Sequence, residues 1–179
     1  MKVIKVLGIG LLILIITPLV VALFTKKEVK VTREIIINKS SAQVYDYIKF
    51  MKNHEKYSKW DTMDPQMKKE YSGTDGQVGF VYAWFSDKPD VGVGEQEILK
   101  MEENKRIDYA LRFKEPFEAS DFAFLELESL SGNQTKVIWG YNGRMNYPMN
   151  AMLWFMDMDK MIGDDFEVGL NNLKSILEN

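Results

Sequence analysis

The chain opens with twenty consecutive residues that carry no charge, from Val6 to Thr25. Because a helix rises about 1.5 Å per residue, about 20 apolar residues cross the hydrocarbon core of a bilayer. Lysines flank this run on both sides, at Lys2, Lys5, Lys26 and Lys27. The pattern predicts a membrane-spanning helix over residues 6–25, within an anchor formed by residues 1–27.

A cleaved signal peptide is the alternative interpretation of this run. Signal peptides usually have a shorter apolar region that ends at small residues, whereas this run ends in Val21-Ala22-Leu23-Phe24. The orientation has two interpretations. More Lys and Arg follow the run than precede it, which favours a cytoplasmic domain. A short tail with lysines is also typical of a signal anchor. We expect a single-pass membrane protein with its domain on the extracytoplasmic side.

Beyond the anchor, the pattern indicates a strand and two short helices. Residues 28–38 are rich in β-branched side chains and predict a strand. The following Lys39-Ser40-Ser41 offers a serine cap for a helix over residues 42–50. A second helix is expected over residues 53–59, and the Asp64-Pro65 turn ends this helical part.

From Met67 onward, β-rich runs alternate with turns that contain Gly, Pro or Asn, which predicts an antiparallel meander. The expected strands are residues 68–72, 78–85, 92–102, 106–114, 119–130 and 135–142. A long helix is expected over residues 150–177, because one set of residues recurs at alternating steps of four and three. This set is Met152, Met156, Asp159, Gly163, Phe166, Leu170, Leu173 and Leu177.

This order predicts an α+β fold in which a curved antiparallel sheet wraps around the C-terminal helix. A space between sheet and helix is a common place for a ligand. All 26 acidic residues but only 19 of the 23 basic ones follow Lys27, so residues 28–179 carry an excess of seven negative charges. Such a domain is a poor nucleic-acid binder, and we expect no nucleic-acid partner. The absence of cysteine is compatible with either side of the membrane.

Several segments, together with this order of elements, resemble the START-like, or SRPBCC, superfamily, which includes polyketide cyclases and lipid-transfer proteins. These segments are KYSKWDTMDP (56–65), YSGTDGQVGFVYAW (71–84), VGVGEQEI (91–98), TKVIWGY (135–141) and MDKMIGDDFEVGLNNLK (158–174). The resemblance covers residues 28–179 and is that of a membrane-anchored bacterial member. It implies a helix-grip fold, and it allows either a lipid carrier or a cyclase- or dehydrase-type enzyme.

Strand alternation selects the residues that face the helix. In the third and fourth strands the more apolar face carries Gln96, Ile98, Tyr109, Leu111 and Phe113. The expected hairpin register pairs Met101 with Arg106 and Glu95 with Arg112, which gathers the charges on the other face. From the second strand, Tyr82 and Trp84 or else Val81 and Phe85 face the helix. The ligand-binding residues that we expect are Trp84, Gln96, Tyr109, Leu111, Trp139, Tyr141, Met152, Met156 and Asp159.

Plain core packing is the alternative role for each aromatic residue and methionine in this set. Asp159, the one polar member of the helical stripe, has two interpretations. It either touches water at the rim of the pocket or orients a hydroxyl or amine of the ligand. The five methionines between Met145 and Met158 favour a pocket that adapts to varied apolar shapes.

Signals for catalysis are weak. Glu95 and Glu97 share a strand face, but the expected position of Arg112 opposite them favours a surface ion pair. His54 is the only histidine, with no visible partner, and a lone histidine does not build a zinc site. There is neither a cysteine nor a G-x-S-x-G motif. We therefore expect no catalytic residue, no metal and no cofactor, and a His54→Ala variant that binds ligand almost unchanged.

The sequence thus leaves three classes of function. The favoured one is membrane-anchored binding or carriage of a hydrophobic small molecule or lipid, since a carrier needs only an apolar cavity. A cyclase- or dehydrase-type enzyme, which needs a buried acid and base, is the second. A stress or assembly module that holds a peptide in the same groove is the third.

Overall fold

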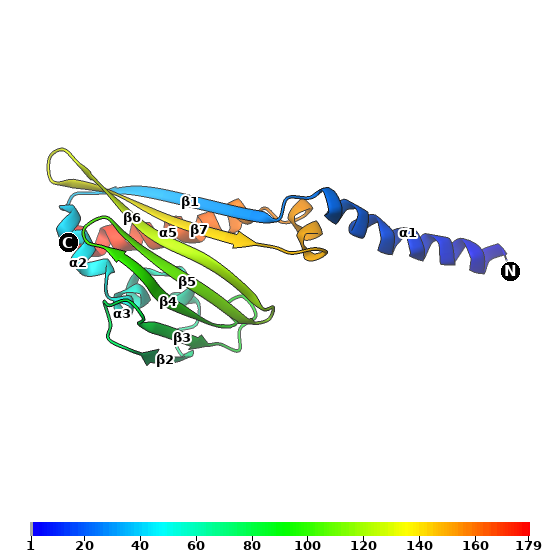
Figure 1. Cartoon of the computed structure of the whole chain (residues 1–179), viewed down its shortest axis with the longest axis horizontal. Helices are drawn as coiled ribbons and strands as arrows, with labels where there is room; N and C mark the ends of the chain where they lie inside the picture. Colours follow the sequence, from blue (N-terminus) through cyan, green and yellow to red (C-terminus); the bar gives the residue numbers. More distant parts are fainter. Residues whose placement is uncertain (1) are drawn as a thin grey trace.

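The computed structural model describes residues 2–179 (Figure 1). The helices are α1 (Lys2–Phe24), α2 (Ser41–Ile48), α3 (Met51–Tyr57), α4 (Lys59–Met63), the 3₁₀ helix η1 (Met149–Trp154) and α5 (Met158–Glu178). The strands are β1 (Glu28–Ile37), β2 (Lys68–Ser72), β3 (Val81–Phe85), β4 (Val93–Glu102), β5 (Arg106–Glu115), β6 (Ala119–Leu130) and β7 (Gln134–Arg144). Each expected strand is present, with ends that shift by up to three residues.

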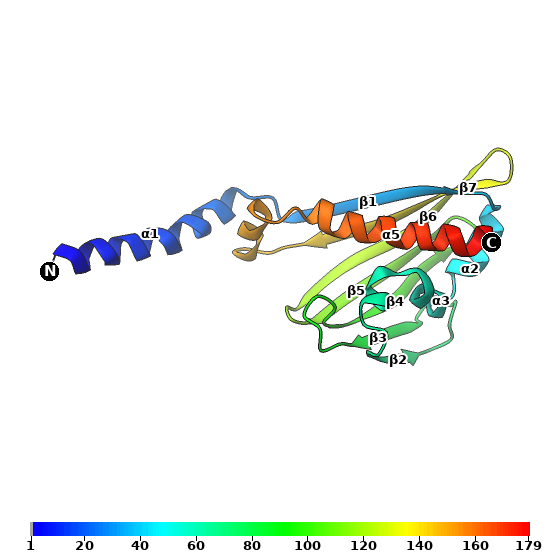
Figure 2. The same ribbon diagram turned by 180° about the vertical axis from the view of Figure 1, so that it is seen from behind.

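The described strands form one antiparallel sheet in the order β1-β7-β6-β5-β4-β3-β2. The sheet curves around α5, and α3 lies between α5 and the β2 side of the sheet (Figure 2). Helices α3 and α4 both contact α5. The ring of Trp139 on β7 stacks on Phe166 of α5, with 4.7 Å between the ring centroids. Gly169 of α5 allows this closeness, since a Cβ there would lie 2.6 Å from the Trp139 ring. The α+β helix-grip prediction is confirmed.

The C-terminal helix begins later than expected. It starts at Met158, where the carboxylate of Asp157 accepts a hydrogen bond from the backbone N–H of Lys160 at 3.0 Å. Residues Met149–Trp154 form the separate helix η1, so the prediction of one helix over residues 150–177 is wrong. The sequence periodicity runs through both helices. The backbone, however, starts a new helix at Asp157, which caps the N-terminus of α5.

The β4–β5 hairpin confirms one predicted pair and corrects another. Glu95 lies opposite Arg112, as expected. Met101, however, lies opposite Ile107, because a register shift between Ile98 and Lys100 inserts one extra residue into β4. Beyond such a bulge, every pair shifts by one position.

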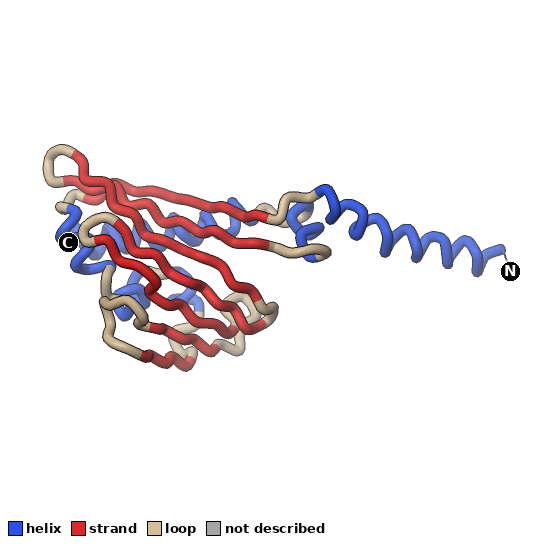
Figure 3. Tube along the Cα trace, viewed as in Figure 1, coloured by secondary structure: helices blue, strands red, loops and turns tan. Residues whose placement is uncertain are grey.

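Helix α1 projects away from the sheet (Figure 3). Residues Val3–Phe24 are long and apolar enough to cross a bilayer, by length and composition. Its 23 residues correspond to a length of about 35 Å. It contacts η1.

Candidate ligand cavity

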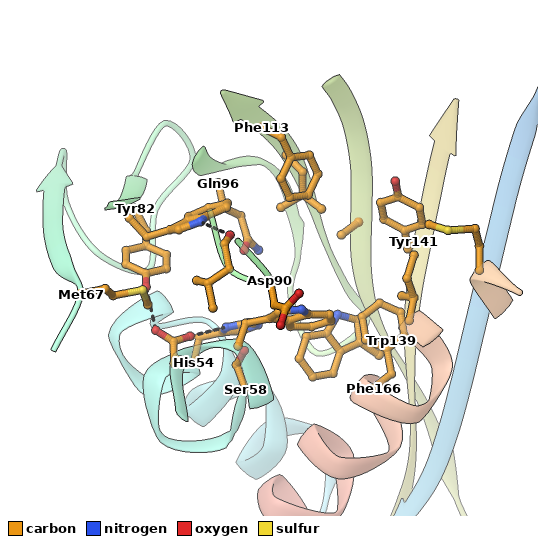
Figure 4. Close-up of a pocket in the computed structure, with 18 residues that line it drawn as sticks. His54, Ser58, Met67, Tyr82, Asp90, Gln96, Phe113, Trp139, Tyr141 and Phe166 are labelled. Carbon is orange, nitrogen blue, oxygen red and sulfur yellow. Dashed lines mark hydrogen bonds and ion pairs between the residues drawn. The ribbon is translucent and has the colours of Figure 1, made fainter. Parts of the chain in front are cut away.

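A cavity of about 270 Å³ lies between the concave face of the sheet, the start of α5 and the helices α3 and α4 (Figure 4). Most of its wall is aromatic or aliphatic. The lining residues are His54, Ser58, Trp60, Asp61, Met67, Tyr82, Trp84, Asp90, Val91, Gln96, Leu111, Phe113, Ala123, Trp139, Tyr141, Met158, Ile162 and Phe166.

The cavity has a mouth and a closed inner end. Phe113 and Tyr141 are half-buried near the C-terminal ends of β5 and β7, and Asp90 in the neighbouring β3–β4 loop is exposed. The opposite end is fully buried and polar, and its side chains come from the short helices and from β3 and β4. These residues are His54, Ser58, Asp61, Tyr82 and Gln96. Figure 4 shows Phe113 and Tyr141 at one end and His54 and Ser58 at the other.

Asp61 is the centre of a buried polar cluster at the inner end. It accepts a hydrogen bond from the Tyr82 hydroxyl at 2.7 Å and lies 3.0 Å from the Lys69 ammonium. Burial favours a higher pKa for Asp61, but His54, Tyr82 and Lys69 together outweigh it and hold the pKa at about 2. Burial, followed by the charge of Asp61, raises the pKa of Tyr82. Asp61 is therefore a carboxylate and Tyr82 a neutral donor.

His54 lies beside this cluster. Its Nδ1 atom is 3.8 Å from an oxygen of Asp61, which is longer than a hydrogen bond. Nδ1 is buried and has no hydrogen-bond partner. The imidazole packs edge-on against Tyr57 and Trp139, with centroids 4.8 Å and 5.1 Å away. These two rings fix the orientation of the imidazole in the cavity wall.

Two further polar side chains lie at the inner end. They are those of Gln96 and Ser58, on residues that are 7% and 1% exposed. Gln96 comes from β4, across the cavity from Ser58 and His54 (Figure 4). Buried polar atoms are nearly always hydrogen-bonded, to protein or to ordered water. The inner end therefore offers hydrogen bonds to whatever occupies the cavity.

The structure brings five of the nine expected ligand-binding residues to this cavity: Trp84, Gln96, Leu111, Trp139 and Tyr141. Tyr109 is buried in the core and does not line the cavity. Met152 lies in η1, and Met156 lies in the link between η1 and α5, so neither reaches the cavity. Tyr82 and Trp84 both line it, which decides between the two faces of the second strand.

Asp159 also lies outside the cavity. It pairs with Arg33 of β1, with 3.0 Å between a carboxylate oxygen and the guanidinium. Gly163 provides room for this pair, because a Cβ at that position would lie 2.0 Å from the guanidinium. Asp159 touches water, since its side chain is 63% exposed, but it does not line the cavity. Its partner, 126 residues away, has no signal in the sequence.

Sequence reasoning missed the polar inner end. His54 was expected outside the site, and Asp61 and Tyr82 were not expected to pair. The sequence does carry one signal, since His54 lies in the second short helix expected before the sheet, over residues 53–59. Asp61 lies in α4, a helix that the pattern did not predict. Which face of such short helices turns inward depends on tertiary packing, which a single sequence does not provide.

The remaining candidates for chemistry are structural. Arg112 lies 3.1 Å from Glu95 and 2.5 Å from Glu97, as the predicted ion pair requires. None of the three lines the cavity. Among residues 2–179, no group of three or more His, Asp or Glu side chains is arranged to hold a metal ion.

Neither a family model nor a curated protein matches the sequence. Solved structures do match. A protein from Chromobacterium violaceum shares 13% identity over 84% of this chain and 97% of that chain, with a TM-score of 0.59. The Aha1 dimer from Colwellia psychrerythraea shares 18% over 84% and 96%, with a TM-score of 0.57. Ara h 8.0201 shares 13% over 84% and 97%, with a TM-score of 0.55.

These likenesses show the fold alone, because the identities are low. The fold is helix-grip. It is consistent with the START-like superfamily that the sequence resembles. Since this fold carries many unrelated activities, function has to be argued from the cavity.

Proposed function

We propose that this chain is a membrane-anchored protein that binds a small hydrophobic molecule or lipid with one polar group. The observation that carries the proposal is an apolar cavity whose buried inner end holds the Nδ1 atom of His54 without a hydrogen-bond partner, beside the polar side chains of Ser58 and Gln96. A buried polar group without a partner costs about 1–3 kcal/mol. A ligand head group that bonds these atoms recovers that free energy, while its apolar body fills the rest of the cavity.

The volume restricts the ligand. A cavity of about 270 Å³ corresponds to about nine water molecules at roughly 30 Å³ each. It is at the lower limit of ligand pockets, which range from about 300 to 1,000 Å³. The proposed ligand is therefore a compact amphiphile with one chain or a small ring system. A lipid with two chains exceeds the space.

The proposed anchor is α1, within residues 1–27, and the proposed binding domain is residues 28–179. The length and composition of α1 support a single span, and we keep the extracytoplasmic side as the proposed location of the domain. Lys26 and Lys27 are exposed at its end, where lysines contact anionic lipid headgroups.

Titration of residues 28–179 with a single-chain fluorescent fatty acid tests the binding proposal. Ala123 lines the cavity and is buried, so Ala123→Phe fills the cavity without touching the polar end. We expect saturable binding at micromolar concentration by the wild type and its loss in Ala123→Phe. Circular dichroism checks that the variant is folded. Equal binding by both proteins would show that the probe binds elsewhere.

A cyclase- or dehydrase-type enzyme is the second candidate, and the position of His54 supports it. An imidazole beside the Asp61 carboxylate in an apolar cavity is a suitable general base. Mass spectrometry of the compounds that co-purify with the wild type and with His54→Gln separates the two candidates. A carrier yields the same compound from both proteins, whereas an enzyme yields substrate from the variant and product from the wild type.

A further inference from the structure

The end of α1 is capped by a residue from the far end of the chain. Asn150 of η1 is fully buried, and its side-chain N–H group donates to the carbonyls of Ala22 at 2.7 Å and Thr25 at 3.0 Å. The indole N–H of Trp154 donates to the hydroxyl of Thr25 at 2.6 Å. The last carbonyls of a helix have no partner within the helix. These bonds therefore hold η1 against the last turn of α1.

Helix η1 does not stop at the end of α1 but lies beside it. A groove between the two is lined on the α1 side by residues from Gly10 to Val21, and on the η1 side by Ala151, Trp154 and Phe155. The distance along α1 from Leu14 to its last residue, Phe24, is about 15 Å. If α1 spans a bilayer, the residues that line this groove lie at membrane depth, and the η1 side chains beside them lie there too.

The side chains around η1 suit that position. Trp154 is 68% exposed and Phe155 is 87% exposed, an unusual state for large apolar residues outside α1. Tyr147, Met149 and Met152 are also exposed in this segment. Trp and Tyr favour the boundary between headgroups and acyl chains, and a large exposed apolar patch marks an interaction surface.

We propose that residues 147–155, which we call the collar, insert into the leaflet that holds the C-terminal end of α1. The partner is the boundary between headgroups and acyl chains of a lipid bilayer. This inference rests on the proposed anchoring by α1. The inference adds to membrane anchoring, because a collar that is hydrogen-bonded to the anchor fixes the orientation of the whole domain relative to the membrane.

The collar also determines where the cavity opens. Tyr141 at the mouth pairs with Val31 of β1. Val31 lies four residues after Lys27, the last residue of the anchor, and four residues of strand span about 13 Å. Met158, another lining residue, lies three residues after the collar. In Figures 1 and 2 the C-terminal ends of β3, β5 and β7 point toward the side from which α1 leaves. The mouth therefore faces the bilayer surface, and a ligand passes between membrane and cavity over a short distance.

A single fluorescent label tests the collar, because the chain has no cysteine of its own. Phe155→Cys in the full chain is labelled with an environment-sensitive nitrobenzoxadiazole and reconstituted into phosphatidylcholine nanodiscs, where both faces are accessible. Leu130→Cys, an exposed apolar position at the opposite end of the sheet, is the matched control. Ile9→Cys, in the middle of α1, reports on the anchor itself.

We expect nitroxide-bearing lipid to quench the label at residue 155 several-fold more than the label at residue 130, and aqueous cobalt to quench in the reverse order. If the Ile9 label contacts lipid while the label at 155 behaves like the one at 130, the proposal that the collar inserts is wrong, and the proposal that α1 anchors the chain is supported. If the Ile9 label is itself accessible to cobalt, both the anchor and the collar are wrong. Because Phe155 is exposed, its replacement leaves the core intact.

Discussion

At the scale of single residues, Gln96 connects stability to binding. Its amide lies in the wall of an apolar cavity, on a residue that is 7% exposed, and burial of a polar group that is not fully hydrogen-bonded costs about 1–3 kcal/mol, which leucine would avoid. We expect Gln96→Leu to raise the free energy of unfolding by about 1 kcal/mol and to weaken binding of a fatty acid about tenfold, or ~1.4 kcal/mol. Urea unfolding and fluorescence titration measure the two effects.

Gln66→Leu is the matched control, since Gln66 is exposed in the turn before β2 and should change neither quantity. A Gln96→Leu variant that loses stability and keeps its affinity would mean that the amide supports the fold instead of the ligand.

The Asp61 cluster predicts a dependence of stability on acid. The pKa of Asp61 is about 2 in the folded protein against an ordinary value of 3.8, so folding favours the ionised carboxylate. The ionised carboxylate therefore contributes about 2 kcal/mol to the free energy of unfolding. This stabilisation is complete above pH 4 and is lost as the pH falls through about 2. The free-energy gap between wild type and Asp61→Asn should therefore shrink by that amount between pH 7 and pH 2. A gap that stays constant in urea titrations at both pH values would contradict the assignment.

Some site residues could be predicted from neighbouring residues in the sequence, and others depend on contacts with distant parts of the chain. Trp84, Gln96 and Trp139 were predictable because alternation along a strand fixes the face of every second side chain. The position of Asp159 was not, because Arg33 reaches it from β1 through the space at Gly163. His54 was missed for a similar reason, since short helices have no periodicity long enough to define an inner face.

At the scale of elements, the strands were predictable and the helix boundary was not. Turn residues and alternation mark each strand locally. The departures in the β4–β5 hairpin are two register shifts, between Val93 and Gly94 and between Ile98 and Lys100. The periodicity through residues 152–156 is that of a helix, but those residues form η1 and the link after it, and η1 packs on α1. A contact with α1, more than 120 residues earlier, overrides the local pattern.

The helix boundary yields a prediction. If Asp157 caps α5, Asp157→Ala should lower the free energy of unfolding by about 1 kcal/mol. In a helix continuous from Asn150 the same change would be stabilising, because alanine favours a helix interior. Asp159→Ala is the comparison, and we expect a smaller loss because its carboxylate, which pairs with Arg33, is 63% exposed. Urea unfolding of the wild type, Asp157→Ala and Asp159→Ala shows whether each change raises or lowers the free energy of unfolding.

At the scale of the whole molecule, α1 should determine where the protein is found. We expect the full chain to stay with membranes after a carbonate wash. Deletion of residues 1–27 should release a folded, soluble domain, because α1 packs on η1 whereas the sheet packs on α5. Full-length protein that washes off would contradict the anchor, and a deletion variant without native circular dichroism would contradict an independent domain.

The central claim is that the cavity holds one compact amphiphile. Native mass spectrometry of the full chain, released from detergent after extraction from its own membranes, tests it most directly. The account predicts a one-to-one complex with a single-chain or small-ring amphiphile, and its absence from Ala123→Phe, which keeps α1 and the collar unchanged. A wild-type chain without any bound compound, or the same compound on both proteins, would contradict the claim.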